Sequence, residues 1–166
     1  MRKIILVGVL GSGKSSIGRE LHRNLGYELF DTDHVSERQV GKSIPEIFEQ
    51  DGEKAFRQYE TELLEQLKRN QISKHIISTG GGMVCSLKNR SLLKELGFVV
   101  WLQCSGQEIL ERTSQNKNRP LLQCEDPMNA IETLLSERSP FYQETAHLEV
   151  KTTGLSVDEV SCGILE

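Results

Sequence analysis

The chain has 166 residues, which is the length of a single domain and is enough to bury a hydrophobic core. Charged residues make up 27% and hydrophobic residues 37%, a balance typical of a folded globular protein rather than a disordered or membrane-spanning chain. The formal net charge of −4 argues against a protein that coats nucleic acid, because phosphate neutralisation needs clustered Lys and Arg. We therefore expect one domain over residues 1–166, with no nucleic-acid or membrane partner.

Two features of the sequence indicate a cytoplasmic protein. Basic residues precede the apolar run at residues 4–10, as in a secretion signal, but Gly8 interrupts the run and no small-residue cleavage pattern follows. We interpret this run as a buried first strand. The cysteines form no C-x-x-C pair, so we expect reduced thiols at Cys85, Cys104, Cys124 and Cys162.

Short apolar runs alternate with helical patterns along the whole chain. We expect strands at residues 3–7, 27–30, 75–78, 98–103 and 147–150. We expect helices at residues 14–25, from 43 to a break at 51–52, from there to about 68, at 87–96, 105–113, 126–144 and from 156 onward. Capping boxes of the form S-x-x-E open three of these helices, at Ser43, Ser105 and Ser156. The alternation predicts an α/β fold with right-handed crossovers and a parallel sheet covered by helices on both faces.

Residues 8–15, G-V-L-G-S-G-K-S, match the phosphate-binding pattern G-x-x-x-x-G-K-[ST] between a predicted strand and a predicted helix. Glycines let backbone N–H groups point at phosphate oxygens, and the helix N-terminus adds partial positive charge. Lys14 is placed to reach the β- and γ-phosphates, and Ser15 to offer its hydroxyl to Mg²⁺. The alternative, a chance glycine-rich turn, is disfavoured by the strand and helix around the motif. The predicted nucleotide-binding residues are Gly11, Ser12, Gly13, Lys14, Ser15 and Ser16.

An acidic pair, Asp31 and Asp33, follows the second predicted strand. Ligands gather at the carboxyl ends of parallel strands, and residues two apart in a strand face the same side. One carboxylate would hold the water shell of a metal while the other takes a proton from an attacking hydroxyl. The alternative is an acidic turn that only caps the following helix. Beside a phosphate-binding loop, the functional interpretation is favoured.

Three consecutive glycines, Gly80, Gly81 and Gly82, follow the third predicted strand. A slack linker would be longer and rich in polar residues, whereas this run is short and is flanked by Ile77 and Met83. Its place in the chain puts it at the same rim as the phosphate-binding loop and the acidic pair. We therefore expect a site where the backbone closely approaches a hydroxylated or anionic ligand.

Three arginines complete the candidate site: Arg57 on the long predicted helix, Arg119 in the irregular stretch 114–125, and Arg138 before S-P-F-Y. Each one taken alone would be a solvated surface charge. A planar guanidinium suits a bidentate grip on a carboxylate, and we expect that role for Arg57 and Arg138. Arg119 lies in N-R-P-L-L, a stretch typical of a lid, and an arginine delivered by a closing loop stabilises a phosphoryl group in transfer.

Together these segments resemble the shikimate kinases over essentially the whole chain. The matching pieces are G-V-L-G-S-G-K-S, S-I-G-R-E-L, F-D-T-D, S-I-P-E-I-F-E-Q-D-G-E-K-A-F-R, S-T-G-G-G, N-R-P-L-L and R-S-P-F-Y. The resemblance implies ATP-dependent phosphorylation of the 3-hydroxyl of shikimate, with Mg²⁺, on the route to chorismate and the aromatic amino acids. It also implies the P-loop fold of the nucleoside monophosphate kinases, with a five-stranded parallel sheet, and we expect a monomer.

The resemblance implies individual roles as well. Asp31 falls on the metal-linked carboxylate, and Asp33 falls on the shikimate-binding aspartate that acts as general base. The shikimate-binding region would cover about residues 33–60, and a mobile lid would cover about residues 114–125. Lys14, Asp33 and Arg119 would be the catalytic residues. The remaining positions fall on shikimate-binding residues at Arg57, Arg138, Gly80, Gly81 and Gly82, on the lid arginine at Arg119 and on the adenine-stacking arginine at Arg112.

One segment departs from the family pattern. In V-K-T-T-G-L-S, Lys151 and Ser156 stand where an aspartate and a proline are common in the adenine-binding loop. The nearest alternative is gluconate kinase or another small P-loop kinase, since gluconate kinases also begin G-V-x-G-S-G-K-S. The triple glycine and N-R-P-L-L favour shikimate. A nucleotide-binding regulatory module is a further alternative, but such a module could dispense with the acidic and arginine residues that this chain carries.

Overall fold

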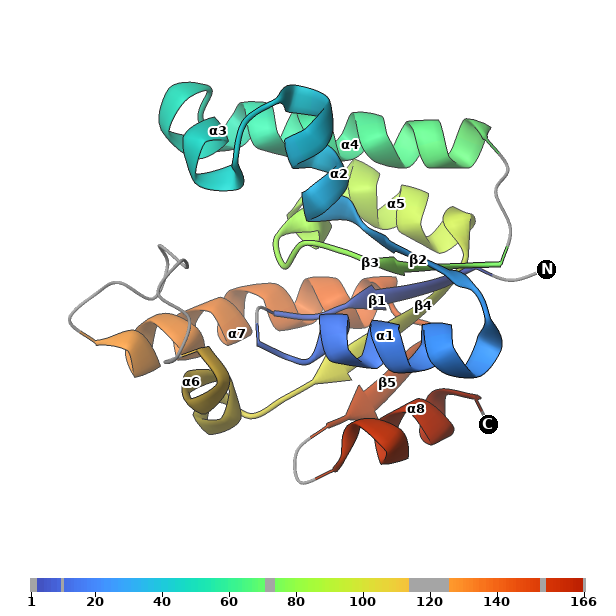
Figure 1. Ribbon diagram of the computed structural model, residues 1–166. Coiled ribbons are helices and arrows are strands. Elements are labelled where there is room, and N and C mark those ends of the chain that lie inside the picture. The colour runs from blue at the N-terminus through green and yellow to red at the C-terminus, as the bar shows by residue number, and fades with distance from the viewer. Residues whose placement is uncertain (1–2, 10, 71–73, 114–125, 153–154, 166) are drawn as a thin grey trace.

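The structure, a computed structural model, describes residues 3–9, 11–70, 74–113, 126–152 and 155–165 (Figure 1). Five parallel strands form one sheet in the order β2-β3-β1-β4-β5. The predicted five-stranded parallel sheet is confirmed, and the ends of β1, β2 and β5 differ from the prediction by one residue. The strands are β1 (Ile4–Val7), β2 (Glu28–Asp31), β3 (His75–Ser78), β4 (Phe98–Gln103) and β5 (Leu148–Lys151).

Helices cover both faces of this sheet, as predicted (Figure 1). Alternate residues of β1 supply the two cores, because successive side chains of a strand point to opposite faces. Ile4 and Leu6 pack with the first set of helices, whereas Ile5 and Val7 pack with the second set. The first set is α1 (Lys14–Leu25) and α8 (Val157–Leu165), and the second is α4 (Glu53–Arg69), α5 (Leu87–Leu96) and α7 (Pro127–Thr145).

Four shorter elements complete the described fold. The serine caps of the three predicted capping boxes are present. The Glu46 N–H donates to Ser43 Oγ at 3.3 Å, the Glu108 N–H to Ser105 Oγ at 3.2 Å, and the Glu159 N–H to Ser156 Oγ at 3.1 Å. No helix in the described ranges is long and apolar enough to cross a membrane. The four elements are α2 (Thr32–Val40), α3 (Ile44–Gln50), the 3₁₀ turn η1 (Met83–Cys85) and α6 (Gly106–Thr113).

Asp33 lies in helix α2, so the prediction that Asp31 and Asp33 face the same side of one strand is wrong. Asp31 ends β2 and caps α2, because its Oδ1 accepts the backbone N–H groups of Asp33 at 3.0 Å and His34 at 3.3 Å. Asp33 therefore lies in the first turn of a helix, and strand alternation does not relate it to Asp31. The helix was not assigned from sequence because its buried residues are the polar Thr32 and Ser36, which leaves no apolar stripe.

Candidate active site

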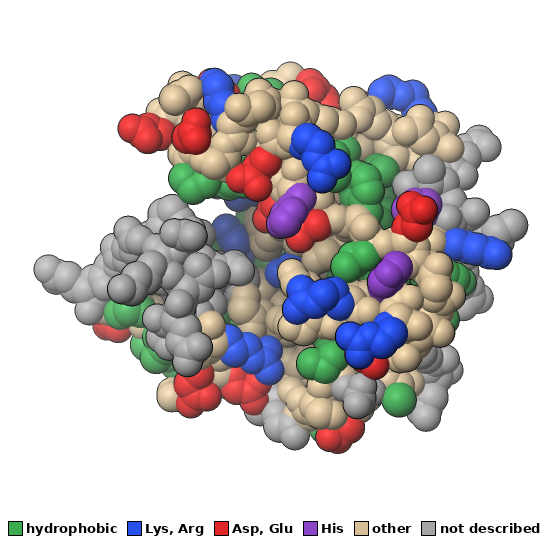
Figure 2. Space-filling model, viewed as in Figure 1, with side chains coloured by type: hydrophobic (Ala, Val, Ile, Leu, Met, Phe, Trp, Pro, Cys, Tyr) green, Lys and Arg blue, Asp and Glu red, His purple; other side chains and the backbone are tan. Residues whose placement is uncertain are grey.

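A large cavity lies at the carboxyl ends of the strands, with a volume of about 1640 Å³. A site for one small molecule occupies about 300–1000 Å³, so this cavity has room for two ligands side by side. The phosphate-binding loop and the start of α1 line one part, and α2, α3, α4 and the glycine run line another. Figure 2 shows the surface hollowed below the part that carries α2 and α3, with charged side chains at its mouth.

The phosphate-binding loop folds tightly around its own lysine. Lys14 Nζ donates to the carbonyl oxygens of Gly8 at 2.6 Å and Val9 at 3.0 Å. Gly8 has φ of 152°, and a Cβ there would lie 2.7 Å from Ser12 Oγ, so only glycine fits this position. The loop ends at Gly13 with φ of 99°, from which α1 starts. The backbone thus forms a preshaped cradle in front of a helix N-terminus, which favours an anion.

The α6 side of the cavity brings Arg112 against this loop. Arg112 Nη1 donates to the Gly11 carbonyl at 3.0 Å, and its Nη2 pairs with Glu108 at 3.0 Å. Across from it, the segment after β5 contributes Ser156, which caps α8, and the cavity wall continues along α8. Lys151 ends β5 and is exposed. Of the two departures from the family pattern, the structure thus places Ser156 in the cavity wall.

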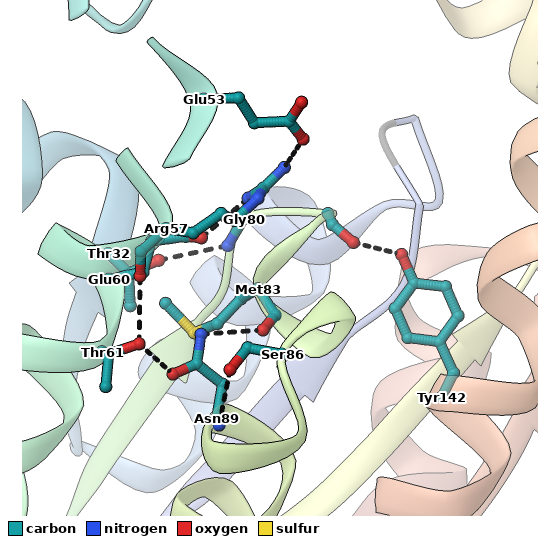
Figure 3. A network of polar contacts seen from close by, with 11 residues as sticks. Thr32, Glu53, Arg57, Glu60, Thr61, Gly80, Met83, Ser86, Asn89 and Tyr142 are labelled. Atoms are coloured by element: carbon teal, nitrogen blue, oxygen red, sulfur yellow. Dashed lines mark hydrogen bonds and ion pairs between the residues drawn. The ribbon is translucent and has the colours of Figure 1, made fainter. Parts of the chain in front are cut away.

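The glycine run lies against side chains from α2 and α4. A Cβ on Gly80 would come within 2.6 Å of Asp33 Oδ1 and 3.2 Å of Glu60 Oε2, and a Cβ on Gly82 within 2.2 Å of Arg57 Nη2. The Gly80 N–H donates to Thr32 Oγ1 at 3.1 Å, which ties the loop to the start of α2 (Figure 3). Because the carboxylates and the guanidinium occupy the space of missing side chains, the run is part of the cavity wall and not a linker.

Half-buried Arg57 and buried Glu60 form an ion pair on one face of α4. Arg57 Nη1 lies 2.7 Å from Glu60 Oε1, and its Nη2 lies 3.4 Å from Glu53 Oε1 (Figure 3). Glu60 is 1% exposed, and burial raises its pKa to about 7, with the pairing to Arg57 opposing and nearby Asp33 adding to the rise. Within the described residues, Arg57 Nε and Glu60 Oε2 are buried without a hydrogen-bond partner. Such unsatisfied groups beside a cavity fit a polar ligand.

Helix α7 completes the site from the other side of the glycine run. Arg138 lines the cavity, and Tyr142, one turn further along, donates its O–H to the Gly81 carbonyl at 2.5 Å. Tyr142 is buried, and this burial raises the pKa of its phenol. Arg57 and Arg138 therefore face the same cavity from two helices that pack on the same face of the sheet.

The structure brings the predicted residues of the described ranges into one cavity: Gly11 to Ser16, Asp31, Asp33, Arg57, the three glycines, Arg112 and Arg138. Arg119 and the expected lid at 114–125 lie outside the described residues. Sequence reasoning missed Glu60 and Tyr142. Glu60 could have been found, because it stands among the apolar residues of the buried face of α4, where a lone carboxylate needs a partner. No comparable pattern marks Tyr142.

The structure has the features of a small-molecule P-loop kinase. A phosphate-binding loop follows the central strand of a parallel sheet, and beside it lies a space, lined by acids and arginines, that is large enough for an acceptor. The family model for shikimate kinase matches residues 10–166. The chain therefore belongs to the shikimate kinase family, as the resemblance of its motifs predicted.

Individual relatives agree with this assignment. A shikimate kinase of Methylococcus capsulatus is 44% identical over 151 residues, which cover 91% of this chain and 83% of that protein. One of Actinobacillus pleuropneumoniae is 41% identical over 165 residues, covering 99% of this chain and 94% of that protein.

Solved structures separate the kinase classes. The shikimate kinase from Acinetobacter baumannii in complex with shikimate superposes with a TM-score of 0.93 at 41% identity, covering 99% of this chain and 91% of that one. A gluconokinase from Sinorhizobium meliloti reaches a TM-score of 0.57 at 18% identity, covering 97% and 87%, and shares the fold alone. The gluconate kinase alternative is therefore not favoured.

Proposed function

We propose that this chain transfers the γ-phosphoryl group of ATP to the 3-hydroxyl of shikimate, giving shikimate 3-phosphate and ADP. The observation that carries this proposal is the pair of arginines, Arg57 and Arg138, that faces the phosphate-binding loop across one cavity. Shikimate has one carboxylate and three hydroxyl groups, so two guanidinium groups, the carboxylates of Asp33 and Glu60, and a bare glycine backbone match its polar groups.

Asp33 is the residue that we assign to proton transfer. It lies beside Gly80 at the acceptor end of the cavity, where the 3-hydroxyl would sit between it and the γ-phosphate. As the hydroxyl oxygen bonds to phosphorus and the bond to the ADP oxygen breaks, Asp33 takes the hydroxyl proton. Lys14 would exchange its carbonyl partners in the loop for phosphate oxygens and stabilise the charge that moves onto ADP.

The oxygen groups near the phosphate-binding loop suit Mg²⁺. Ser15 lies in the first turn of α1 at the cavity wall, and Asp31 uses Oδ1 for the cap of α2, so that Oδ2 is the oxygen we assign to a water of the ion. Mg²⁺ keeps several waters and prefers one or two protein oxygens together with substrate phosphates. The described residues accordingly hold no group of three or more His, Cys, Asp and Glu that would enclose an ion. When bound, Mg²⁺ would neutralise part of the phosphate charge.

The division of the domain is also part of the proposal. Residues 33–60, which include α2, α3 and the start of α4, would hold shikimate, and we infer that residues 114–125 close as a lid with Arg119 over the phosphates. We further propose that the enzyme is a cytoplasmic monomer and that its two substrates are ATP and shikimate.

A coupled assay of ADP release tests the function, with shikimate, gluconate and nucleoside monophosphates offered in parallel. We expect turnover with shikimate only. Turnover with gluconate alone would replace the assignment by the second candidate of this fold, and ATP binding without turnover of any acceptor would indicate the regulatory module.

A further inference from the structure

The 3₁₀ turn η1, which directly follows the glycine run, is held by two consecutive side chains of α5. Asn89 Nδ2 donates to the Met83 carbonyl at 3.0 Å. Arg90 Nη1 donates to the carbonyls of Val84 at 2.8 Å and Cys85 at 3.3 Å. All three carbonyl oxygens of the turn are therefore bound by this Asn89–Arg90 pair.

Asn89 also connects the turn to the helix that carries Arg57. Its Oδ1 accepts the hydroxyl of Thr61 at 2.6 Å, and that same hydroxyl oxygen lies 3.0 Å from the Arg57 carbonyl one turn earlier in α4 (Figure 3). The orientation of the amide follows from these partners, because only the NH₂ group can donate to the Met83 carbonyl. Asn89 is fully buried at 0% exposure, so water does not replace either contact.

Arg90 makes the equivalent connection to the helix that carries Arg138. Its guanidinium carbon lies 4.4 Å from the centre of the Phe141 ring, and its Nε lies 3.1 Å from Glu144 Oε2. Both partners are on α7, and Tyr142 between them binds the Gly81 carbonyl. The glycine run and its turn are therefore tied to α4 on one side and to α7 on the other.

We propose that the Asn89–Arg90 pair is a positioning device that sets the spacing of Arg57 and Arg138 for the carboxylate of the acceptor. This inference rests on the proposed function. Neither side chain lines the cavity, so both act through the turn and the two helices. Arg57 has little room to move toward the glycine run, since its guanidinium already occupies the place where a Cβ on Gly82 would lie. A bidentate grip depends on geometry within fractions of an ångström, and it is therefore sensitive to the supports behind it.

The sharpest test is the pair of variants Thr61→Val and Thr61→Ser. Valine has nearly the shape of threonine but cannot donate to Asn89, whereas serine keeps the hydroxyl. We expect Thr61→Val, Asn89→Asp and Arg90→Lys to raise the KM for shikimate by about tenfold, while the KM for ATP stays within about twofold. Thr61→Ser should stay close to the wild type in both constants.

Leu93→Val is the control for a merely structural effect, because Leu93 is buried in the core on the same helix, its apolar side chain cannot hydrogen-bond the carbonyls of the turn, and it does not line the cavity. It should lower Tm without changing either KM. If Thr61→Val, Asn89→Asp and Arg90→Lys behave like this control, or raise both KM values together, the pair has no positioning role. A wild type without any turnover of shikimate would instead refute the proposed function, and this inference with it.

Discussion

Gly82→Ala is the substitution whose effect can be worked out most directly from the structure. Gly82 has φ of −97°, which alanine adopts without strain, so the backbone should not change. The added Cβ would lie 2.2 Å from Arg57 Nη2, whereas a comfortable contact needs about 3.4 Å, so the guanidinium has to move by about 1 Å. Movement away from Gly82 would disturb the ion pair of Arg57 with Glu60 and the contact that we propose between Arg57 and the acceptor carboxylate.

The expected loss follows from the strength of the contact. A hydrogen bond to a charged group contributes about 1.5–3 kcal/mol, which corresponds to about 10- to 150-fold in binding. We therefore expect kcat/KM for shikimate to fall by about one to two orders of magnitude, with the KM for ATP unchanged and Tm lowered by only a few degrees. Initial rates with each substrate varied in turn provide both constants.

Two controls make the Gly82 experiment decisive. Gly163→Ala adds a methyl group where nothing lies within 4 Å, and it should leave both constants unchanged. In an Arg57→Ala background, Gly82→Ala should have no further effect on shikimate, because the displaced group is already absent. A Gly82→Ala enzyme with wild-type kcat/KM for shikimate, or one whose defect persists without Arg57, would show that the guanidinium does not act from this position.

Three further predictions concern the carboxylates and the lid. Asp33→Asn should lower kcat by about 10²- to 10⁴-fold while ATP affinity, measured by direct titration, is retained; an unchanged rate would leave Asp33 without a catalytic role. The raised pKa of Glu60 means that the folded state holds a proton that the unfolded state loses, so stability should fall as the pH rises from about 4.5 to about 7. Chemical denaturation of Glu60→Gln should show a flatter pH profile than the wild type over that window, and parallel profiles would contradict the assignment. Arg119→Ala should reduce kcat by about 10³-fold with little change in ATP affinity if it acts on the transferred phosphoryl group; near-normal kcat would mean a solvated charge.

The parts of the site that could be predicted from sequence are those set by local backbone requirements. Gly8 and Gly13 need positive φ, and Lys14 follows them at a helix start, so the motif determines its own geometry. The position of Arg57 followed from the apolar spacing of α4, which is a property of nearby residues.

Contacts between segments distant in the chain could not be predicted in this way. The perturbed pKa of Glu60 arises because α4 packs against Gly80 and α2, and the Tyr142 bond to Gly81 joins residues 61 positions apart. Helix α2 was overlooked for a different reason. It is specified by its ends, the Asp31 cap and Gly41 with φ of 79°, and not by an apolar stripe.

The strand order has a consequence for how acceptor specificity can change. β1 lies in the middle of the sheet, with β3 and β2 on one side and β4 and β5 on the other. The acceptor residues of α2, α4 and the glycine run follow or connect the first two strands, whereas Arg112 and the α8 cap follow the second two. Apart from Arg138 on α7, the proposed acceptor residues thus lie on one half of the sheet and the proposed nucleotide residues on the other, with the phosphate-binding loop at the dividing line. Exchange of the segment between β2 and β3 would therefore replace Asp33, Arg57 and Glu60 together, and we expect it to change the preferred alcohol while Arg138 and the nucleotide half stay in place.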